Sequence, residues 1–385
     1  MIDGKLSAWQ RAGLLDAQTV AAIRAYEAEN ARPLVLWAAI GLGALAVGLG
    51  LVSVVAANWE DIPGRLRLAV HFLALAGLAA LLWRLGRDLA VEASWAGEAS
   101  WAEEAALFVF GVLGLTFFGH VGQVYQTSAP LWQPLAAWLV LFAPAIALRG
   151  SGWLTAGLVA LVVTWASWGF ADPARPLFGA EARSDAVIGL ATALPVLLAP
   201  LGAWMDRLGA REGFWWRLEQ LGFAYAIACA SLVIVASAFG ELDGDGLLTF
   251  TAQGVQALVG LVAAAPVALA RRDPPGASSA TVLAGSALAI LAAHAVEGSQ
   301  LGAALLFMAL WVGIALAALQ GGSRGVFQLA VATVAARLVI LSFELASDLL
   351  TSGFGLILAG VLILAIAWGA VRLSRRLAPA RRGAA

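Results

Sequence analysis

The sequence has 385 residues, of which 62% are hydrophobic and only 12% are charged, and its mean hydropathy is +0.88. Soluble proteins carry about 25% charged residues, so this composition excludes a soluble globular protein and indicates a polytopic membrane protein. The single cysteine, Cys229, excludes an intrachain disulfide and a cysteine-based metal cluster.

The first 33 residues are polar and predict a short cytoplasmic helical hairpin rather than a cleavable signal peptide. The first helix of the hairpin is expected to end at Gly13, and Asp16 is expected to cap the second helix, Ala17–Asn30. Five apolar residues should form the small buried face of this hairpin: Trp9, Leu14, Leu15, Val20 and Ile23.

Residues 34–371 contain twelve windows of the length that a membrane-spanning helix needs, about 17–25 mostly apolar residues. They predict an all-α, polytopic transmembrane helix bundle with spans at 34–57, 66–86, 105–125, 131–148, 153–170, 184–205, 218–239, 248–270, 280–296, 301–320, 325–343 and 351–371. The spans 131–148 and 280–296 are short, and re-entrant segments are the alternative there. A basic cytoplasmic tail, residues 372–385, follows the last span.

The distribution of positive charge predicts the orientation of this bundle. With the N-terminus inside, eighteen of the 23 lysines and arginines fall in inside segments and four outside, while Arg337 lies within a span. Both termini are therefore expected in the cytoplasm. Polar and aromatic residues gather at the outward ends of the spans, whereas the inward ends carry arginines typical of simple anchors. We therefore expect a functional site in the outer half of the membrane.

Residues 91–104 contain the near-repeat EASWAG/EASWAE between the second and third spans. Their acids and tryptophans predict an acidic helix that lies near the bilayer on the cytoplasmic side. A flexible linker is the alternative interpretation.

The third span carries a polar stripe of Thr116, His120, Gln123 and Thr127, at spacings that place all four on one helical face. Unpaired polar groups are costly in hydrocarbon, so this face must line a cavity or contact another helix. We expect His120 and Gln123 to line a cavity, and the two threonines to form interhelical hydrogen bonds. For His71 in the second span, we expect one ordinary hydrogen bond.

Arg337 lies in the otherwise apolar stretch Val326–Phe343 of the eleventh span. A guanidinium stays protonated and needs a partner at membrane depth. Glu344 and Asp348 share its helical face, but Glu344 is about 10 Å away along the helix axis. An ion pair within the helix is the structural alternative, and it would need both long side chains to stretch toward each other. We expect Arg337 to reach another helix, a lipid phosphate or a ligand rather than Glu344.

Several segments together resemble a family of uncharacterised bacterial membrane proteins, the domain of unknown function two-one-five-seven. The resemblance is carried by Trp9-x3-Gly13-Leu14-Leu15-Asp16-x-Gln18, by Ala56-Ala57-Asn58-Trp59-x2-Ile62-Pro63, and by Gly122-Gln123-Val124-Tyr125-Gln126. It covers mainly residues 5–150. It implies a bacterial inner-membrane protein and transfers no chemistry.

The sequence contains no metalloprotease, Walker A or nucleophile-elbow motif, and it indicates no cofactor, no metal and no nucleic acid as partner. The first functional hypothesis is a transporter or flippase-like protein that holds an anionic or amphipathic ligand in an outward-opening cavity between spans 1, 3 and 11. The residues assigned to this ligand site are Arg337, Glu344, Asp348, His120, Gln123, Tyr125, Asn58 and Trp59. A membrane enzyme that acts on lipid-linked or periplasmic substrates is the second hypothesis. The third is a sensor or assembly factor whose residues 1–33 and 91–104 bind a cytoplasmic partner.

Overall fold

The computed structural model describes residues 6, 9–10, 13–29, 62–92, 101–126, 129–171, 184–209, 213–242, 248–271, 274–345, 361, 368–369 and 372. This part of the chain is helical and contains no strand, which confirms the predicted all-α class. The chain divides into two compact units, Met1–Arg67 and Leu68–Ala385, and each is described by itself. The predicted span 34–57 lies outside the described residues, as does most of 351–371.

The first unit contains α2 (Ala17–Glu29), and Asp16 caps it as predicted. The Oδ1 atom of Asp16 accepts a hydrogen bond of 2.6 Å from the backbone N–H of Thr19. This hydrogen bond lowers the pKa of the exposed Asp16 carboxyl below its usual value. Gly13 adopts a φ of 70° and Leu14 N–H donates to Trp9 O, a turn in which glycine escapes the penalty on a left-handed backbone.

The apolar face of this unit differs in part from the prediction. Leu6 and Val20 are buried, whereas Trp9 and Leu14 are 44% and 71% exposed. The prediction was wrong for Trp9 and Leu14 because helical periodicity does not continue through the turn at Gly13, so spacing along the chain no longer places side chains on one face.

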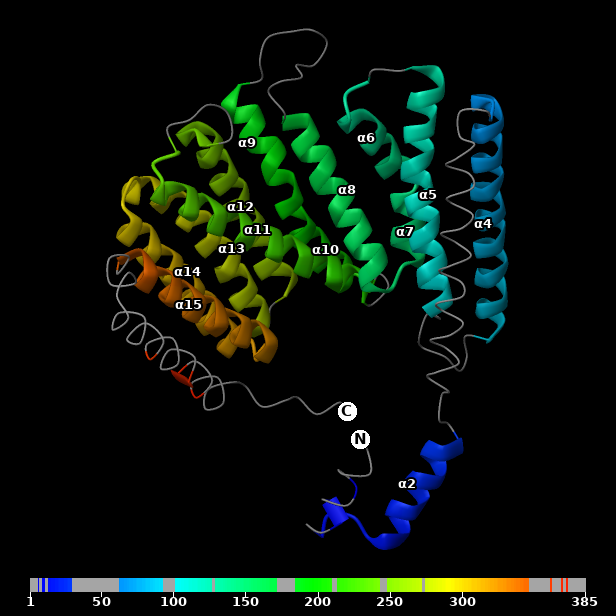
Figure 1. Ribbon diagram of the computed structural model, residues 1–385, viewed down its shortest axis with the longest axis horizontal. Coiled ribbons are helices and arrows are strands. Elements are labelled where there is room, and N and C mark those ends of the chain that lie inside the picture. The colour runs from blue at the N-terminus through cyan, green and yellow to red at the C-terminus, as the bar shows by residue number, and fades with distance from the viewer. Residues whose placement is uncertain are drawn as a thin grey trace. The chain divides into compact units, whose positions relative to one another are not determined.

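The second unit is a bundle of helices, and α4, which begins in the first unit, leads into it (Figure 1). Its elements are α4 (Gly64–Glu92), α5 (Trp101–Tyr125), α6 (Trp132–Leu141), α7 (Ala143–Arg149), α8 (Trp153–Ala171), α9 (Asp185–Ala193), η2 (Leu194–Leu197), α10 (Leu198–Arg207), α11 (Phe214–Ala238), α12 (Phe250–Ala270), α13 (Pro274–Ala293), η4 (His294–Val296), α14 (Gln300–Gln320) and α15 (Arg324–Leu345). Among the described residues, nine candidate spans are long and apolar enough to cross a membrane, or ten with the bent pair α6–α7. These candidates correspond one by one to the ten predicted spans between 66 and 343. The predicted short span 280–296 belongs to a candidate of 21 residues, Gly276–Val296.

Two spans are interrupted at prolines. The α6–α7 pair bends by 42° where Pro144 enters the first turn of α7, because proline lacks an N–H and clashes with the preceding turn. The span Asp185–Arg207 is broken at its centre by η2, which contains Pro195. It is also the most enclosed candidate, with 67% of its window buried.

Small residues let the central helices approach closely, as is common where helices associate in membranes. A Cβ atom added to Gly222 of α11 would lie 2.4 Å from the backbone nitrogen of Ala199 in α10. A Cβ atom added to Gly189 of α9 would likewise lie 2.2 Å from the backbone oxygen of Ala252 in α12. Larger side chains would therefore force these helix pairs apart.

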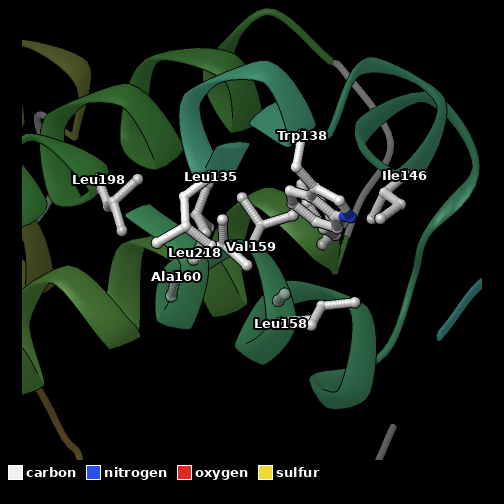
Figure 2. Close-up of a cluster of buried hydrophobic side chains, with 11 residues drawn as sticks. Leu135, Trp138, Ile146, Leu158, Val159, Ala160, Leu198 and Leu218 are labelled. Carbon is white, nitrogen blue, oxygen red and sulfur yellow. The ribbon is translucent and has the colours of Figure 1, made fainter. Parts of the chain in front are cut away.

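A cluster of buried hydrophobic side chains surrounds Trp138 of α6. Figure 2 shows the indole of Trp138 among Leu135, Val159 and Ile146. Trp138 is fully buried, and its Nε1–H donates a hydrogen bond of 2.8 Å to the carbonyl of Gly111 in α5. The indole therefore fills the space between α5, α6 and α8 without leaving its polar atom unpaired.

The order of the helices in space separates two of the predicted site segments. Helix α5 packs against α6, α7 and α8, whereas α15 packs against α14. Figure 1 shows α5 at one side of this unit and α15 at the opposite side. The predicted cavity between spans 3 and 11 is therefore wrong, because other helices lie between α5 and α15.

Candidate functional site

One end of the helix bundle brings four arginines together. Arg149 ends α7 and bonds Glu103 near the start of α5. Arg207 near the end of α10 donates a hydrogen bond of 2.7 Å to Leu269 O near the end of α12. Arg217 at the start of α11 donates to Ser151 O, and Arg271 follows α12. We call this the arginine-rich end.

At this end Arg271 joins three helices by binding two carboxylates. Its Nε lies 2.9 and 3.0 Å from the two carboxylate oxygens of Glu219 in α11, and its Nη2 lies 2.9 Å from Asp206 Oδ2 in α10. Nη2 also contacts Glu219 Oε2. The hydrogen bonds that Arg271 donates to Glu219 raise the pKa of the Arg271 guanidinium, so this group keeps its charge.

Glu103 and Glu104 form a second polar contact between helices at the same end. Arg149 donates to Glu103 at 2.8 and 3.0 Å. The Glu104 carboxylate accepts hydrogen bonds from the backbone N–H groups of Ser151 and Thr155 and from the Thr155 hydroxyl. It therefore satisfies donors at the N-terminus of α8, where a negative charge is favoured.

These contacts correct two predictions. The arginines at this end, which the sequence assigned to inward ends as simple anchors, instead bond acids and carbonyls of neighbouring helices. The two ends of the segment 91–104 belong to the flanking spans rather than to a separate surface helix: α4 continues to Glu92 and α5 begins at Trp101, and both Glu103 and Glu104 are buried. Residues 93–100 lie outside the described part of the chain.

A cavity of about 470 Å³ opens beside Glu219 and Arg271, between α11, α13, α14 and α15. Its walls include large apolar side chains, namely Trp216, Phe223, Ile227, Val282, Trp311 and Ile314. Polar groups gather at the arginine-rich end of the cavity: Glu219, Gln220, Arg271, Ser278, Ser279 and Ser323. The cavity is therefore apolar along the helices and polar at one end.

The charged groups differ in how far they reach the cavity surface. The Glu219 side chain is 1% exposed, whereas the Arg271 side chain is 25% exposed. Ser323 immediately precedes α15, so the first N–H groups of that helix also lie at this rim. The accessible part of the polar end thus includes the Arg271 guanidinium and the start of α15 rather than the bare Glu219 carboxylate.

Arg337 lies elsewhere and has a local partner. Its Nη1 lies 2.8 Å from Glu344 Oε1, on the next turns of the same helix α15. The expectation that Arg337 reaches another group instead of Glu344 was wrong, because the two long side chains extend toward each other and close the axial gap. Asp348, the third charged residue of the predicted set, lies outside the described residues.

Among the predicted site residues that the structure describes, the others do not lie together with Arg337 and Glu344. Gln123 and Tyr125 on α5 are exposed, Tyr125 by 60%. Asn58 and Trp59 lie outside the described residues. His120, by contrast, contacts His71 of α4, with 2.7 Å between their Nδ1 atoms, so the prediction that His71 makes only an ordinary hydrogen bond missed this pair.

His294 and Glu297, which are three residues apart, do not bond each other. The ring of His294 meets Phe250 edge-on at 5.1 Å between centroids. Glu297 accepts a hydrogen bond of 3.0 Å from Leu242 N–H and so ties the α13–α14 turn to the chain after α11. His294 therefore packs against a neighbouring ring, and Glu297 holds a turn.

The broken span Asp185–Arg207 contributes a small polar cluster inside the bundle. Tyr225 donates to Thr192 O at 2.6 Å, and Gln256 donates to the Thr192 hydroxyl at 2.7 Å. These residues, with Ser286, line a cavity of about 20 Å³, a volume that holds a single water molecule. The cluster satisfies polar groups released where the helix is interrupted.

The ion-paired cluster and the cavity beside it were not predicted from the sequence. Glu219 and Arg271 are 52 residues apart, and each lies at a helix end, where a charge is ordinary. One available signal was Glu219 itself, an acid that begins an otherwise apolar span and needs a partner once buried. No group of three or more metal-ligating side chains occurs among the residues described by the structure.

Comparison with known families gives one match. Residues 7–155 match the family model described as "Predicted membrane protein (DUF2157)", which confirms the resemblance found in the sequence over this part of the chain. No curated protein and no solved structure matches the chain. The match and the apolar helices together identify a multi-pass integral membrane protein.

Proposed function

We propose that this membrane protein binds a lipid-like amphipathic molecule in the cavity between α11, α13, α14 and α15 and carries it across the membrane, as a transporter or flippase does. The observation that carries this proposal is the division of the 470 Å³ cavity into apolar walls and a polar end. Small-molecule pockets have volumes of about 300–1,000 Å³. An amphipathic molecule would place its tail along Ile227 and Ile314 and its head group beside Arg271.

The proposed head group is anionic. The Arg271 guanidinium is more exposed than the Glu219 carboxylate beside it, and the polar residues Gln220 and Ser323 line the same end. The N-terminus of α15 adds a partial positive charge at Ser323. Phosphate and carboxylate head groups both suit such a set of donors.

The proposed orientation places the arginine-rich end in the cytoplasm of a bacterial cell, with the protein in the inner membrane. Positive charge concentrates on the cytoplasmic side of membrane proteins, and Arg149, Arg207, Arg217 and Arg271 all lie at this end. The ligand would then enter from the cytoplasmic leaflet. This differs from the outward-opening cavity that the polar clusters in the sequence predict.

The two carboxylates beside the cavity are already engaged within the protein. Asp206 and Glu219 both bond the Arg271 guanidinium, and the Glu219 side chain is almost fully buried. The geometry thus favours a carrier over the membrane enzyme that the sequence left open.

A cavity-filling substitution tests the proposal. Ala228 lines the cavity, and Ala228→Trp should occupy the space of the tail. Ala332→Trp on the exposed side of α15 is the matched control, since Ala332 does not line the cavity. In proteoliposomes that contain a phosphatidic acid with a diazirine on its acyl chain, cross-links should form at Ile227, Val282 or Ile314. Ala228→Trp should reduce them at least fivefold and Ala332→Trp should not.

A transport assay separates a carrier from a protein that only binds. Vesicles with a fluorescent anionic lipid should show protein-dependent movement between leaflets, measured by quenching from outside, and Ala228→Trp should abolish the protein-dependent part. Cross-linking that is unchanged in Ala228→Trp contradicts the binding site. Specific cross-linking without any movement of lipid contradicts the carrier function.

A further inference from the structure

The cavity between α11, α13, α14 and α15 ends inside the bundle at Trp311 of α14. Helices α11, α13 and α15 begin near the arginine-rich end, and α14 ends there. The lining residues that lie farthest from this end on the four helices are Ala228, Val282, Trp311 and Leu329. Trp311 is the largest of these four side chains, so its indole is the main obstacle at the inner end of the cavity.

A hydrogen bond holds this indole across the gap between two helices. Its Nε1–H on α14 donates to the hydroxyl oxygen of Ser231 on α11 at 3.2 Å. Ser231 is not a lining residue, and it lies three residues, about 4.5 Å along the helix, beyond Ala228. The ring therefore lies between the cavity and the deeper part of the bundle, and its polar atom is paired.

Behind the indole the helices pack closely. Trp311 packs against a cluster of buried side chains that includes Ala230, Ile234 and Leu310, each exposed by 8% or less. Phe307 lies one turn deeper on α14, with 6.2 Å between its ring centroid and that of Trp311. In the part of the chain that the structure describes, the indole thus separates an open cavity from a filled core, and a tail extends past it only if the ring moves.

The side chains around the inner half of the cavity are apolar. Ile227, Val282 and Leu329 line it together with the indole, whose Nε1–H already bonds Ser231. A polar group without a partner is costly in such surroundings. The end of a ligand that meets the indole must therefore be hydrocarbon.

The depth of the cavity sets the length of this hydrocarbon end. Glu219 at the polar end and Ala228 at the inner end are nine residues apart on α11, a distance of about 13 Å at 1.5 Å per residue. An extended chain covers about 1.2 Å per bond, since three backbone bonds span about 3.3–3.6 Å. A straight tail that reaches from the polar end to the indole therefore has about ten carbons.

We infer that Trp311 determines the length of tail that the cavity accepts, and that the ligand is an amphiphile with a tail of about ten carbons. This inference rests on the proposed function, because it takes the head group of the ligand to lie beside Arg271. Ser231 is a positioning residue: it does not touch the tail and acts by holding the indole in place.

A series of lysophosphatidic acids that differ only in tail length tests this proposal. Each competes, in nanodiscs that contain the full chain, with cross-linking of the diazirine-labelled phosphatidic acid. Competition is corrected for the partition of each lysolipid into protein-free nanodiscs. In the unsubstituted protein a ten-carbon tail should compete at least fivefold better than a sixteen-carbon tail. A ten-carbon alkyl phosphate with a terminal diazirine should cross-link to Trp311 or Leu329.

Two variants at the inner end should change this preference. In Trp311→Ala the sixteen-carbon tail should compete as well as the ten-carbon tail. Ser231→Ala frees the indole and should reduce the preference at least twofold. Leu316→Ala is the matched control, because Leu316 lies on the exposed side of α14 and does not line the cavity; it should keep the full preference.

The outcomes separate this proposal from the proposed function. The proposal is overturned by a length preference that is unchanged in Trp311→Ala, or by a terminal diazirine that labels only residues beside Arg271, while the binding site stands. Should Trp311→Ala fail to fold, Ser231→Ala and the terminal cross-link in the unsubstituted protein decide the question. Absence of any cross-link to the cavity in the unsubstituted protein contradicts the proposed function and this proposal with it.

Discussion

Two ion-paired sites in this molecule contain the same chemical groups and differ in what they connect. Arg271 binds Glu219 and Asp206 and so joins α10, α11 and α12. Arg337 binds Glu344 within α15 alone. The first site contains a carboxylate that is 1% exposed, whereas Glu344 is 31% exposed.

This difference shows that the position of a charge in the sequence is a poor guide to its structural importance. Arg337 stands out because apolar residues surround it along the chain, yet a residue seven positions away satisfies it. Arg271 is inconspicuous at the end of a span, yet several helices and a cavity meet beside it. The partners of a charge, rather than its apolar neighbours, decide what its removal costs.

The largest effect on the free energy of unfolding is expected when Arg271 is removed, and Arg337 provides the comparison. Arg271→Ala leaves Glu219 buried without its counter-charge, which costs about 3–5 kcal/mol. Arg337→Ala leaves a half-exposed carboxylate and should cost about 1 kcal/mol or less. Thermal unfolding in detergent, followed by tryptophan fluorescence, measures both. Equal losses in the two variants would remove the distinction between the interhelical and the intrahelical pair.

Glu104 offers a second test at the arginine-rich end. Glu104→Gln removes the charge that accepts hydrogen bonds from the start of α8, and the free energy of unfolding should fall by about 1.5–3 kcal/mol, the value of hydrogen bonds to charged groups. Glu241→Gln, at an exposed position, is the control and should be neutral. The same unfolding assay applies, and a neutral Glu104→Gln would contradict the role given to this carboxylate.

Two glycine substitutions test the contact between helices without changing any charge. Gly222→Ala places a Cβ atom 2.4 Å from Ala199 N, so the helices must separate, at a cost of about 1–3 kcal/mol. Gly254→Ala meets nothing within 4 Å and should be neutral or stabilising by up to about 1 kcal/mol. Urea or thermal unfolding of the two variants distinguishes these outcomes. A tolerated Gly222→Ala would show that α10 and α11 pack less closely than described.

The smallest effect on stability is expected at Asp16. Its hydrogen bond to Thr19, like that of Arg337 to Glu344, joins residues that are near each other in the sequence. Its pKa in the folded chain lies below the usual value near 3.8 because Thr19 N–H bonds the carboxylate. The stabilisation is therefore present above that pH and is lost as the pH falls through the folded value. Hydrogen exchange of the Thr19 and Val20 amides should accelerate in that acidic range and in Asp16→Ala at neutral pH. Unchanged exchange in Asp16→Ala would contradict the cap.

Hydrophobic windows predicted the helices well because a span needs a fixed length of apolar chain wherever it packs. The ten predicted spans that fall in the described residues have their counterparts in the structure, and Asp16 was correctly placed as a cap. Hydropathy along the chain does not indicate which helices are neighbours in space. They therefore placed Arg337 and His120 in one cavity, although α15 and α5 lie apart.

The candidate site could not be assembled from the sequence for the same reason. The contact between Glu219 and Arg271 depends on how α11 and α12 pack, which periodicity along either helix does not specify. The His71–His120 pair depends likewise on the approach of α4 and α5. In both cases the sequence shows a polar residue in or beside a span, but it does not show which residue of another helix is its partner.

A density map of the protein in nanodiscs that contain anionic lipid would show whether a lipid occupies the cavity beside Arg271. We predict elongated density in the cavity between α11, α13, α14 and α15, with its polar end within hydrogen-bonding distance of Arg271 and its tail beside Ile227 and Ile314. A cavity that contains only ordered water, while lipid head groups gather at Arg337, would contradict the account.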